Sequence, residues 1–525
     1  MTTTVKIMIP CSFPCSDIKE VKMKAYLPGV ISDAEKVLFE KREADPLDLM
    51  KKAAAEVYKN ISDLLRRFDA ITVLCGKGNN AGDGYELARL LKRDGFNVCC
   101  IAALGVMPAT DIAKDRYDAF VEAGGKVEYD ENAAKDIIAM SDVIFDAVFG
   151  IGFKGSIEKG SALYELIDTA NRSRGKRIAI DVPSGINPSD GSVGGAAFLA
   201  DTTVTITAVK AGMLSYPAKL FCGNIETADI GISSELLDSY ENPCVVPDDR
   251  YVKRVLRKRS AVSNKGDYGK LLCVCGSEYM KGAAVLSTGA ALRAGTGLVT
   301  LASEESVIRC AQSHLLEPIY IPLNLEDERE TDTFLQSVSK YSSILIGCGL
   351  GQSEKKRKAL EYIIKNVDAQ LIIDADGINM LADNINVLKE AKKAPIITPH
   401  PGEFSRISGL DVGYINDNRI SCAVGFSKGY GCITVLKGAG TITASPDGRF
   451  AVNTSGNAGL AKGGSGDVLA GLIAGLCACS GASPYECAAV GVYLHGRAAD
   501  ILREKYSEYG LLPSDLSEEF AKLLP

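Results

Sequence analysis

The carboxylate of Asp467 follows a glycine-rich stretch that could bind a phosphate group. Residues 457–467 read Asn-Ala-Gly-Leu-Ala-Lys-Gly-Gly-Ser-Gly-Asp, and the apolar run at 468–476 is typical of a helix. Glycines let backbone N–H groups approach a phosphate, and a helix N-terminus adds a favourable dipole. A carboxylate in an anion site is unfavourable unless it does chemistry or holds a metal, so Asp467 is a candidate general base. The alternative is that Asp467 only caps the helix.

Two further segments of the second half place polar groups at the ends of predicted strands. Residues 437–441, Lys-Gly-Ala-Gly-Thr, follow the apolar run at 432–436 and form another backbone-rich turn suited to a nucleotide. His400 lies between two prolines after the run at 394–397, and the prolines would hold it rigidly. A histidine in this position either contacts a ligand or plays a structural role, and the sequence leaves both open.

The first half has its own glycine-rich segment, Gly-Lys-Gly-Asn-Asn-Ala-Gly-Asp-Gly at 76–84, between a predicted strand and the helical pattern at 85–92. A loop at that junction is where open α/β sheets bind phosphate-bearing ligands. Ala81 breaks the usual dinucleotide pattern, and the P-loop ending is absent. The amides of Asn79 and Asn80 could offer oxygens to a monovalent cation or hold a tight turn. We expect Asp83 to cap the loop or the following helix.

Two more predicted strands of the first half end in polar residues. Asp146 follows the run at 143–145 and precedes a glycine-rich segment at 150–155, and Asp-Val-Pro-Ser-Gly at 181–185 follows the run at 177–180. The carboxyl ends of parallel strands converge on one crevice. The sequence therefore predicts a single site built from three strand ends.

Apolar runs alternate with helical patterns along the whole chain, which indicates βαβ units and mostly parallel sheets. The chain of 525 residues is too long for one core. Pro243, Pro247 and a basic cluster at 253–259 separate the halves, and we place the domains at 1–240 and 255–525. No repeated motif links the halves, which indicates a fusion of two different α/β domains. The predicted strands are 70–75, 97–103, 143–145, 177–180, 203–207, 270–275, 298–302, 343–347, 370–374, 394–398 and 432–436.

Composition excludes several classes of protein. A net charge of −7 and the lack of a long basic run argue against a nucleic-acid surface, and no apolar run is long enough for a membrane span or a signal peptide. We interpret the sixteen cysteines as small apolar residues of a protein in a reducing cytosol. Cys11 and Cys15 lack a matching downstream pair, so we expect no zinc. Residues 1–22 could be a strand, a swapped arm or a disordered lead.

The first-half motifs at 79–84, 146–155 and 181–185 resemble the NAD(P)H-hydrate epimerase family, which has a Rossmann-like fold. Ala81 departs from that family's usual Asn-Asn-Gly-Gly-Asp-Gly. The resemblance implies a potassium ion bound by Asn80, Asp146 and Ser184, and Asp181 in contact with the substrate ring. Asp181 as the acid/base of epimerisation is our hypothesis. The implied residues that bind the hydrated nucleotide are Asn79, Asn80, Ala81, Gly82, Asp83, Gly150, Ile151, Gly152, Phe153, Lys154, Gly155, Ser156 and Asp181.

The second-half motifs, with Gly-Cys-Gly-Leu-Gly at 347–351 and Asp-Ala-Asp-Gly at 374–377, resemble the ADP/ATP-dependent NAD(P)H-hydrate dehydratases, a branch of the ribokinase-like fold. The resemblance covers 255–525. Gly-Cys-Gly replaces the Gly-Pro-Gly common in the family. By the resemblance, Ala283, Gly349, His400 and Asp467 face the hydrate. The implied adenine-nucleotide residues are Lys437, Gly438, Ala439, Gly440, Thr441 and Gly466.

The resemblance implies a bifunctional enzyme that repairs hydrated NADH and NADPH. The first half would interconvert the R and S hydrates, and the second would dehydrate the S form with ADP or ATP, releasing AMP or ADP and phosphate. Magnesium would bridge the nucleotide phosphates, and Asp467 would take the hydroxyl proton. We expect a cytoplasmic homo-oligomer. One alternative is a ribokinase-like small-molecule kinase fused to a nucleotide-binding domain without catalytic activity, and another treats the first half as a scaffold.

Overall fold

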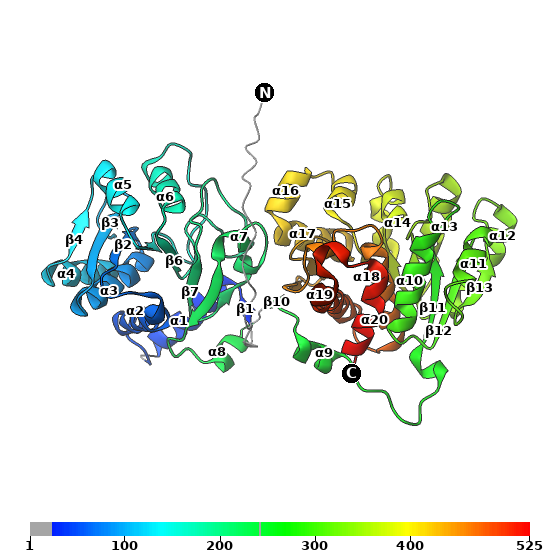
Figure 1. Cartoon of the computed structure of the whole chain (residues 1–525). Coiled ribbons are helices and arrows are strands. Elements are labelled where there is room, and N and C mark those ends of the chain that lie inside the picture. Colours follow the sequence, from blue (N-terminus) through cyan, green and yellow to red (C-terminus); the bar gives the residue numbers. More distant parts are fainter. Residues whose placement is uncertain (1–23, 42, 241–242) are drawn as a thin grey trace.

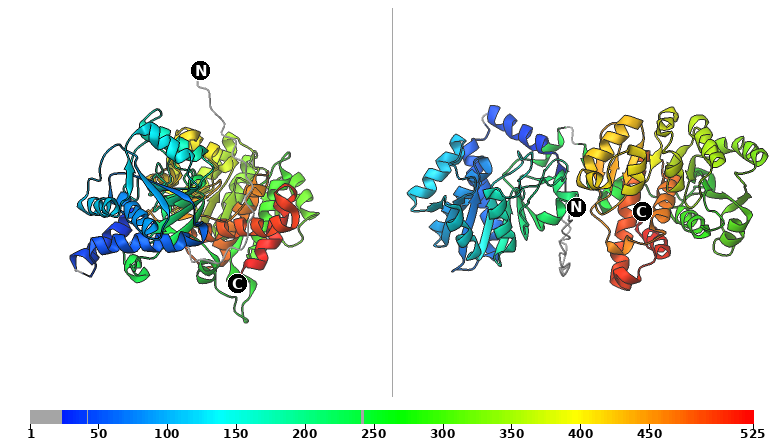
Figure 2. Two further views of the ribbon diagram at one scale, coloured as in Figure 1. Left: turned by 60° about the vertical axis from the view of Figure 1, so that its left-hand side comes forward. Right: turned by 90° about the horizontal axis from the view of Figure 1, so that it is seen from above.

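The computed structural model describes residues 24–41, 43–240 and 243–525 of the chain, which form two α/β domains that lie side by side (Figures 1 and 2). One domain holds a seven-stranded sheet and the other a ten-stranded sheet. A parallel pair, β1 (Ala25–Tyr26) with β8 (Val209–Lys210), lies near the boundary between the domains. The segment 1–22, with Cys11 and Cys15, falls outside the described residues. The predicted α/β class is confirmed.

The first sheet is parallel throughout and has the order β4-β3-β2-β5-β6-β7-β9. Chain order reverses between β2 and β5, which makes this the strand order of a Rossmann-like sheet and puts the ligand crevice at that point. The predicted Rossmann-like class is therefore confirmed. Sequence patterns missed only the two edge strands. The strands are β2 (Ala70–Cys75), β3 (Asn97–Ala102), β4 (Lys126–Glu128), β5 (Val143–Ala147), β6 (Lys176–Ile180), β7 (Thr202–Ile206) and β9 (Asn224–Ala228).

Helices cover both faces of this sheet. One face packs against three helices, α2 (Pro46–Ile61), α3 (Asn79–Arg93) and α4 (Asp111–Glu122). The other face packs against α5 (Glu131–Ala139) and α6 (Ala162–Arg172). Two further helices, α1 (Pro28–Glu40) and α8 (Ser234–Asp238), contact each other near the boundary between the domains.

The glycine-rich segment of the first domain is mostly helix, so the predicted loop at 76–84 is wrong from residue 79 onward. Helix α3 begins at Asn79, and Gly78 is its N-cap. The glycines allow close packing rather than a turn: a Cβ on Gly82 would lie 2.5 Å from Met50 Sδ, and one on Gly84 would lie 2.6 Å from Ala147 Cβ. Asp83 is inside the helix and caps neither end, which corrects the prediction of a capping role.

The second sheet has the order β10-β19-β18-β17-β16-β15-β14-β11-β12-β13, with antiparallel pairing only around β18. Apart from the edge strand β10, which pairs with β19, its chain order also reverses once, between β11 and β14, although the halves share no repeated motif. Sequence patterns missed four strands, the edge strands β10 and β13 and the antiparallel pair β18 and β19. The strands are β10 (Cys244–Val245), β11 (Lys270–Val274), β12 (Leu298–Ser303), β13 (Ile319–Pro322), β14 (Ser343–Ile346), β15 (Gln370–Ile373), β16 (Ile396–Ile397), β17 (Ile433–Leu436), β18 (Ile442–Ala444) and β19 (Phe450–Val452).

Helices also cover both faces of the second sheet. On one face lie α13 (Glu354–Asn366), α14 (Asp376–Met380), α15 (Pro401–Ser408) and α17 (Arg419–Tyr430). On the other lie α10 (Lys281–Arg293), α11 (Glu305–Gln312), α18 (Ser465–Cys479), α19 (Pro484–Gly510) and α20 (Pro513–Leu523). Among the described residues no helix is long and apolar enough to cross a bilayer.

The closest helix packing in the second domain joins α10 and α18. The predicted helix at 468–476 is confirmed, and it begins earlier, at Ser465 after the left-handed Gly464. A Cβ added to Gly471 would lie 2.0 Å from the carbonyl oxygen of Ser287 on α10. Glycine at 471 therefore fixes the depth at which α18, the helix that starts at the candidate phosphate site, packs against its neighbour.

Replacing Gly471 by Ala should destabilise the second domain by about 1–3 kcal/mol, because a backbone atom cannot give way to the new methyl group. Scanning calorimetry should show a lower melting temperature. The matched control is Gly425→Ala in α17, where an added Cβ has no neighbour within 4 Å and the substitution should be neutral or stabilising. A Gly471→Ala protein that melts at the wild-type temperature would contradict this account of the packing.

Candidate active sites

The crevice of the first domain brings together the three predicted cation ligands, Asn80, Asp146 and Ser184. Asp146 accepts hydrogen bonds from the Ser184 backbone N–H at 2.6 Å and from its hydroxyl at 2.7 Å. Asn80 Nδ2 donates to the carbonyl of Phe149 at 2.8 Å, and the Phe149 N–H donates to Ser184 Oγ at 2.9 Å. The three side chains thus form one network around the backbone of Phe149, two residues after β5.

The donor atoms in this network suit a cation with oxygen ligands. Asn80 Oδ1 is buried and has no hydrogen-bond donor among the described residues. Asp146 is fully buried, and this burial raises its carboxyl pKa to about 6 despite the hydrogen bonds from Ser184. A nearby positive charge would stabilise the ionised carboxylate, and the unpaired amide oxygen supplies a second ligand of the kind that hard cations prefer.

Asp181 lies in the same crevice and is held by a buried ion pair with Lys210. Its backbone has φ of 69°, an unusual value for a residue other than glycine. Its oxygens accept from the N–H groups of Ile206 and Ile151, both at 3.2 Å. Lys210 also donates to Thr205 Oγ1 at 2.9 Å. Sequence patterns missed Lys210, although a single lysine within the apolar stretch 203–214 was a usable signal.

Two more carboxyl groups surround this ion pair. Asp83 on α3 is buried, and burial together with the charges of Asp181 and Glu35 raises its pKa well above the usual value. Burial and the Asp181 charge raise the pKa of Glu35, on α1, to about 6. Carboxyl groups with raised pKa values near Asp181 are an arrangement suited to acid/base chemistry. Sequence patterns missed Glu35, because a half-buried glutamate on an amphipathic helix resembles a surface residue.

The other predicted hydrate-binding residues differ in where they lie. Gly150 must be glycine, since a Cβ there would lie 2.9 Å from Asp181 Oδ2. Asn79 accepts from the Thr110 hydroxyl at 2.8 Å, and the methyl of Ala81 is buried in the hydrophobic core. Phe153 packs on Phe149 with ring centroids 4.7 Å apart. The structure thus brings Gly150 and Ile151 to Asp181, whereas Gly82 packs on Met50. The other predicted residues of this loop have no described hydrogen bond to Asp181: Gly152, Lys154, Gly155 and Ser156.

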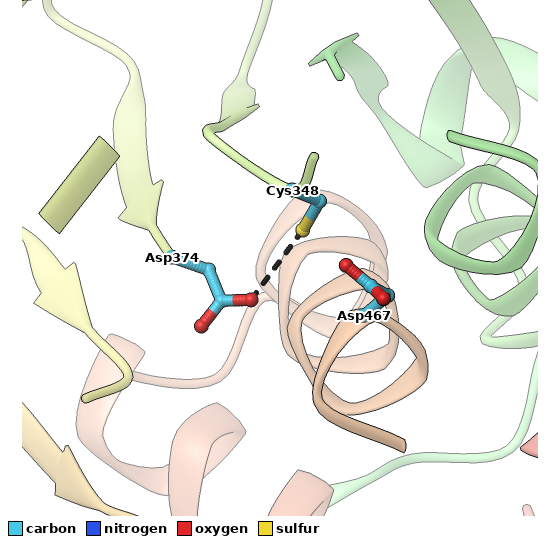
Figure 3. Close-up of side chains that lie close together, drawn as sticks. All are labelled: Cys348, Asp374 and Asp467. Atoms are coloured by element: carbon cyan, nitrogen blue, oxygen red, sulfur yellow. Dashed lines mark hydrogen bonds between the residues drawn. The ribbon is translucent and has the colours of Figure 1, made fainter. Parts of the chain in front are cut away.

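The second site gathers Cys348, Asp374 and Asp467 (Figure 3). Cys348 lies just after β14, Asp374 directly follows β15, and Asp467 lies in the first turn of α18. One potential ligand atom from each of the three residues lies within 4.8 Å of the others. Asp374 is buried and accepts from Lys437 Nζ at 2.8 Å and from the Thr398 hydroxyl at 2.6 Å. Sequence reasoning noted Asp374 within a motif but did not identify it as the partner of Lys437.

Asp467 is the third residue of α18, and the described contacts show no capping hydrogen bond from its side chain. The alternative that it only caps the helix is therefore wrong. Burial, followed by the charge of Asp374, raises the pKa of Asp467 to about 6, whereas Lys437 acts in the opposite direction. A carboxyl group with this pKa is mostly ionised at neutral pH and still basic enough to accept a proton.

Glycines bring the backbone close to these charged groups. A Cβ on Gly466 would lie 3.4 Å from Lys437 Nζ, and the turn at 437–441 contains two glycines with positive φ, Gly438 and Gly440. Burial alone lowers the pKa of Lys437, but Asp374 and Glu403 outweigh it, so the net shift is upward and the ammonium stays charged. The site therefore combines a fixed positive charge with exposed backbone N–H groups, as phosphate binding requires.

Two other predicted hydrate contacts lie around this centre. A Cβ on Gly349 would lie 2.7 Å from Ala283 Cβ, so these two residues are neighbours. His400 caps α15, accepting at Nδ1 from the N–H groups of Gly402 at 3.0 Å and Glu403 at 3.3 Å. The structural role of His400 is thus confirmed, and half of its side chain stays exposed, so a ligand can still reach it.

The donor set fits a magnesium ion that is held mainly by substrate phosphates. Asp374 already binds Lys437 and Thr398, and a thiol such as Cys348 is a poor ligand for this hard ion. Asp467 remains as the available carboxylate. Magnesium commonly has one or two protein carboxylates and completes its coordination with water and phosphate oxygens.

Comparisons with known proteins agree with this division into two sites. Residues 46–212 match the family model described as YjeF-related protein N-terminus, and residues 271–522 match the model described as NAD(P)H-hydrate dehydratase. One similar solved structure is ADP/ATP-dependent NAD(P)H-hydrate dehydratase from Bacillus subtilis co-crystallized with ATP/Mg2+. It is 32% identical in sequence with a TM-score of 0.47, and the match covers 53% of this chain and 97% of that chain.

Full-length relatives span both domains. Bifunctional NAD(P)H-hydrate repair enzyme Nnr of Escherichia coli (strain K12) is 34% identical over 454 residues, which are 86% of this chain and 84% of that protein. The protein of the same name from Thermofilum pendens is 34% identical over 490 residues, which are 91% of each chain. The chain therefore belongs to the family of bifunctional NAD(P)H-hydrate repair enzymes.

Proposed function

We propose that this protein repairs hydrated NADH and NADPH, using the first domain to epimerise the R and S hydrates and the second to dehydrate the S form with ADP or ATP. The proposal rests above all on Asp467, a partly buried carboxyl group with a pKa of about 6 at the start of α18, beside Lys437 and between two glycine-rich segments. Family membership supports the pairing of the two activities in one chain.

In the second domain, phosphorylation makes the hydroxyl group of the hydrate a better leaving group. Asp467 takes the hydroxyl proton while the oxygen forms a bond to the terminal phosphorus of the nucleotide, and ADP leaves from ATP or AMP from ADP. The ring nitrogen then expels phosphate, and loss of a proton from the adjacent ring carbon restores the double bond. Lys437 and the N–H groups near Gly466 neutralise the charge that develops on the transferred group. Bound magnesium, held mainly by the nucleotide phosphates near Asp467, would supply further charge neutralisation there.

The remaining assignments at this site follow the same pattern. Residues 437–441 and Gly466 would bind the adenine nucleotide. Ala283, Gly349 and His400, with Asp467, would face the hydrate.

In the first domain, Asp181 would exchange a proton with the hydrated ring, with Lys210 holding its carboxyl group in position. Residues 79–83 and 150–156 would bind the hydrate. Asn80, Asp146 and Ser184 would bind a potassium ion, and the buried, unpaired Asn80 Oδ1 supports this assignment. The ion would balance the buried Asp146 charge and fix the loop that carries Gly150.

The division of the chain into 1–240 and 255–525 stays a prediction. Strand β10 and the helix α9 (Asp249–Val255), which packs on α19, extend the second domain's packing to residues before 255. A cytoplasmic location and a homo-oligomeric state also stay predictions, and the free cysteines at the described positions suit a reducing compartment.

The test of the proposed dehydration uses the separated S hydrate with magnesium and either ADP or ATP. The near-ultraviolet absorbance of the reduced nicotinamide should return, with one phosphate released per molecule of product. The rival, a small-molecule kinase, would instead give a stable phosphorylated alcohol and no return of absorbance. That result would overturn the proposal.

The pH dependence of dehydration should follow the pKa of Asp467. Because the base must be ionised and burial raises its pKa to about 6, kcat/KM should be constant above that pH and fall about tenfold per pH unit below it. The measurement is the initial rate at low hydrate and saturating nucleotide across this range, with nucleotide binding followed in parallel as a control. A profile that shows no inflection near pH 6 would argue against Asp467 as the base.

A further inference from the structure

The segment that follows Lys210 lies at the boundary between the two domains. It consists of the short helices η2 (Ala211–Leu214) and α7 (Lys219–Cys222) and the residues between them (Figure 1). Ala211 and Leu214 are buried in a hydrophobic cluster that otherwise belongs largely to the second domain. This first-domain segment is therefore packed into the surface of the other domain rather than facing solvent.

Tyr216 in this segment lies against the turn at 437–441. A Cβ added to Gly440 would lie 3.1 Å from Tyr216 Cδ2 and 3.6 Å from the Leu214 carbonyl oxygen. Gly440 has φ of 62°, so the turn requires glycine for its backbone as well as for this contact. The aromatic ring thus covers one side of the turn to which the proposed function assigns the adenine nucleotide.

Lys219, three residues further along, lies over the Tyr216 ring, with Nζ 5.8 Å from the ring centroid. It is largely buried, and the charge of Asp500 partly offsets the lowering of its pKa by burial. Asp500 accepts from the Gly456 N–H at 2.9 Å and from Asn457 Nδ2 at 3.0 Å. Asn457 begins the glycine-rich stretch that ends at Asp467, so Asp500, whose charge acts on Lys219, anchors the start of that stretch.

A third contact joins the two domains near the turn at 437–441. Ser421 on α17 donates to Asp190 of the first domain at 3.3 Å. Two residues earlier, Arg419 donates to the carbonyl groups of Leu436 at 2.9 Å and Lys437 at 3.1 Å, directly before and at the start of the turn. First-domain residues therefore reach the turn at 437–441, the helix that braces it and the anchor of the glycine-rich stretch.

We propose that residues 214–219 of the first domain form part of the adenine-nucleotide site of the second domain, with Tyr216 as a positioning residue for the turn at 437–441. This inference rests on the proposed function of that turn. Lys210, which pairs with Asp181 in the first site, lies four residues before this segment, so ten residues, 210–219, connect the two active sites along the chain.

The test measures the affinity of the full-length protein for ADP and ATP, each with magnesium, by titration calorimetry. Tyr216→Ala should weaken nucleotide binding about 3- to 10-fold, the range expected for loss of aromatic packing. The loss should raise the KM for nucleotide rather than lower kcat. Tyr216→Phe keeps the ring carbons that face Gly440 and should bind within about twofold of wild type, and Lys219→Met should lose about two- to fivefold.

The matched control is Leu220→Ala, in α7 directly after Lys219, at a side chain that is 50% exposed, which should leave nucleotide affinity unchanged. If wild-type protein binds neither nucleotide, the proposed function fails. If wild type binds and Tyr216→Ala binds equally well while folded by circular dichroism, only the present inference fails. An equal loss in Tyr216→Ala and Leu220→Ala would also overturn it, because the effect would then be general loosening of the boundary.

Discussion

Asp467→Asn is expected to lower kcat for dehydration by about 10²–10⁴-fold, the usual contribution of a general base. Asparagine has nearly the same shape as aspartate, so the start of α18 and the glycine-rich stretch should stay in place. The substitution also removes a buried negative charge that burial and Asp374 oppose, so the protein should be no less stable. The measurement is single-turnover return of the reduced-nicotinamide absorbance from the S hydrate with saturating nucleotide.

The control for Asp467→Asn is Glu305→Gln, which removes a carboxylate from the first turn of the exposed helix α11. It should leave dehydration unchanged. Nucleotide binding by Asp467→Asn, measured separately, shows whether the site is still assembled. A folded, nucleotide-binding Asp467→Asn protein with a kcat within about threefold of wild type would rule out proton transfer to Asp467, since a base is worth far more.

Asp181→Asn is expected to lower the rate of epimerisation by about 10²–10⁴-fold for the same reason. Here the substitution has a second effect, because it leaves the buried Lys210 ammonium without its charged partner. Breaking a buried ion pair from one side costs about 3–5 kcal/mol, so lost activity alone would not identify the role of Asp181. The double variant Asp181→Asn with Lys210→Met removes both charges and should recover much of the stability but not the activity.

Epimerisation can be followed by chromatographic separation of R and S hydrates without nucleotide, so the second domain cannot consume either form. The matched control is Asp201→Asn. Asp201 pairs with Arg177 at 2.7 Å at the amino ends of β6 and β7, whereas Asp181 follows the carboxyl end of β6. Loss of this pair should affect stability only. Full epimerase activity in the stable double variant would show that Asp181 is structural.

The sequence predicted the parts of the fold that depend on local pattern. Central strands such as β2 and β14 are apolar on both faces, and their runs end where polar residues begin, so their bounds were found within one or two residues. Edge strands such as β4 and β13 have exposed side chains and no such pattern. Helix α3 was predicted to start too late, because its first turns contain glycines that are needed for contacts with Met50 and Ala147 rather than for a loop.

The structure brings predicted site residues together where a motif follows a central strand. Partners were missed where they come from elsewhere in the chain. Asn80, Asp146, Ser184 and Asp181 meet because strand ends of a parallel sheet converge. Lys210 and Glu35 reach Asp181 from segments without a recognisable motif, and only tertiary packing shows that they are buried. The contact of Tyr216 with Gly440 joins two domains, so no pattern within either domain could predict it.

The most direct test of the proposed bifunctional repair is the complete conversion of a mixed pool. Wild-type protein with magnesium and ADP, or ATP, should convert an equilibrium mixture of R and S hydrates entirely to NADH or NADPH, with one phosphate released per hydrate. Asp181→Asn with Lys210→Met should consume the S form quickly and the R form only at the slow uncatalysed rate of epimerisation. If wild-type protein instead consumes only the S form, or yields a stable phosphorylated product, the two domains do not perform the proposed reactions.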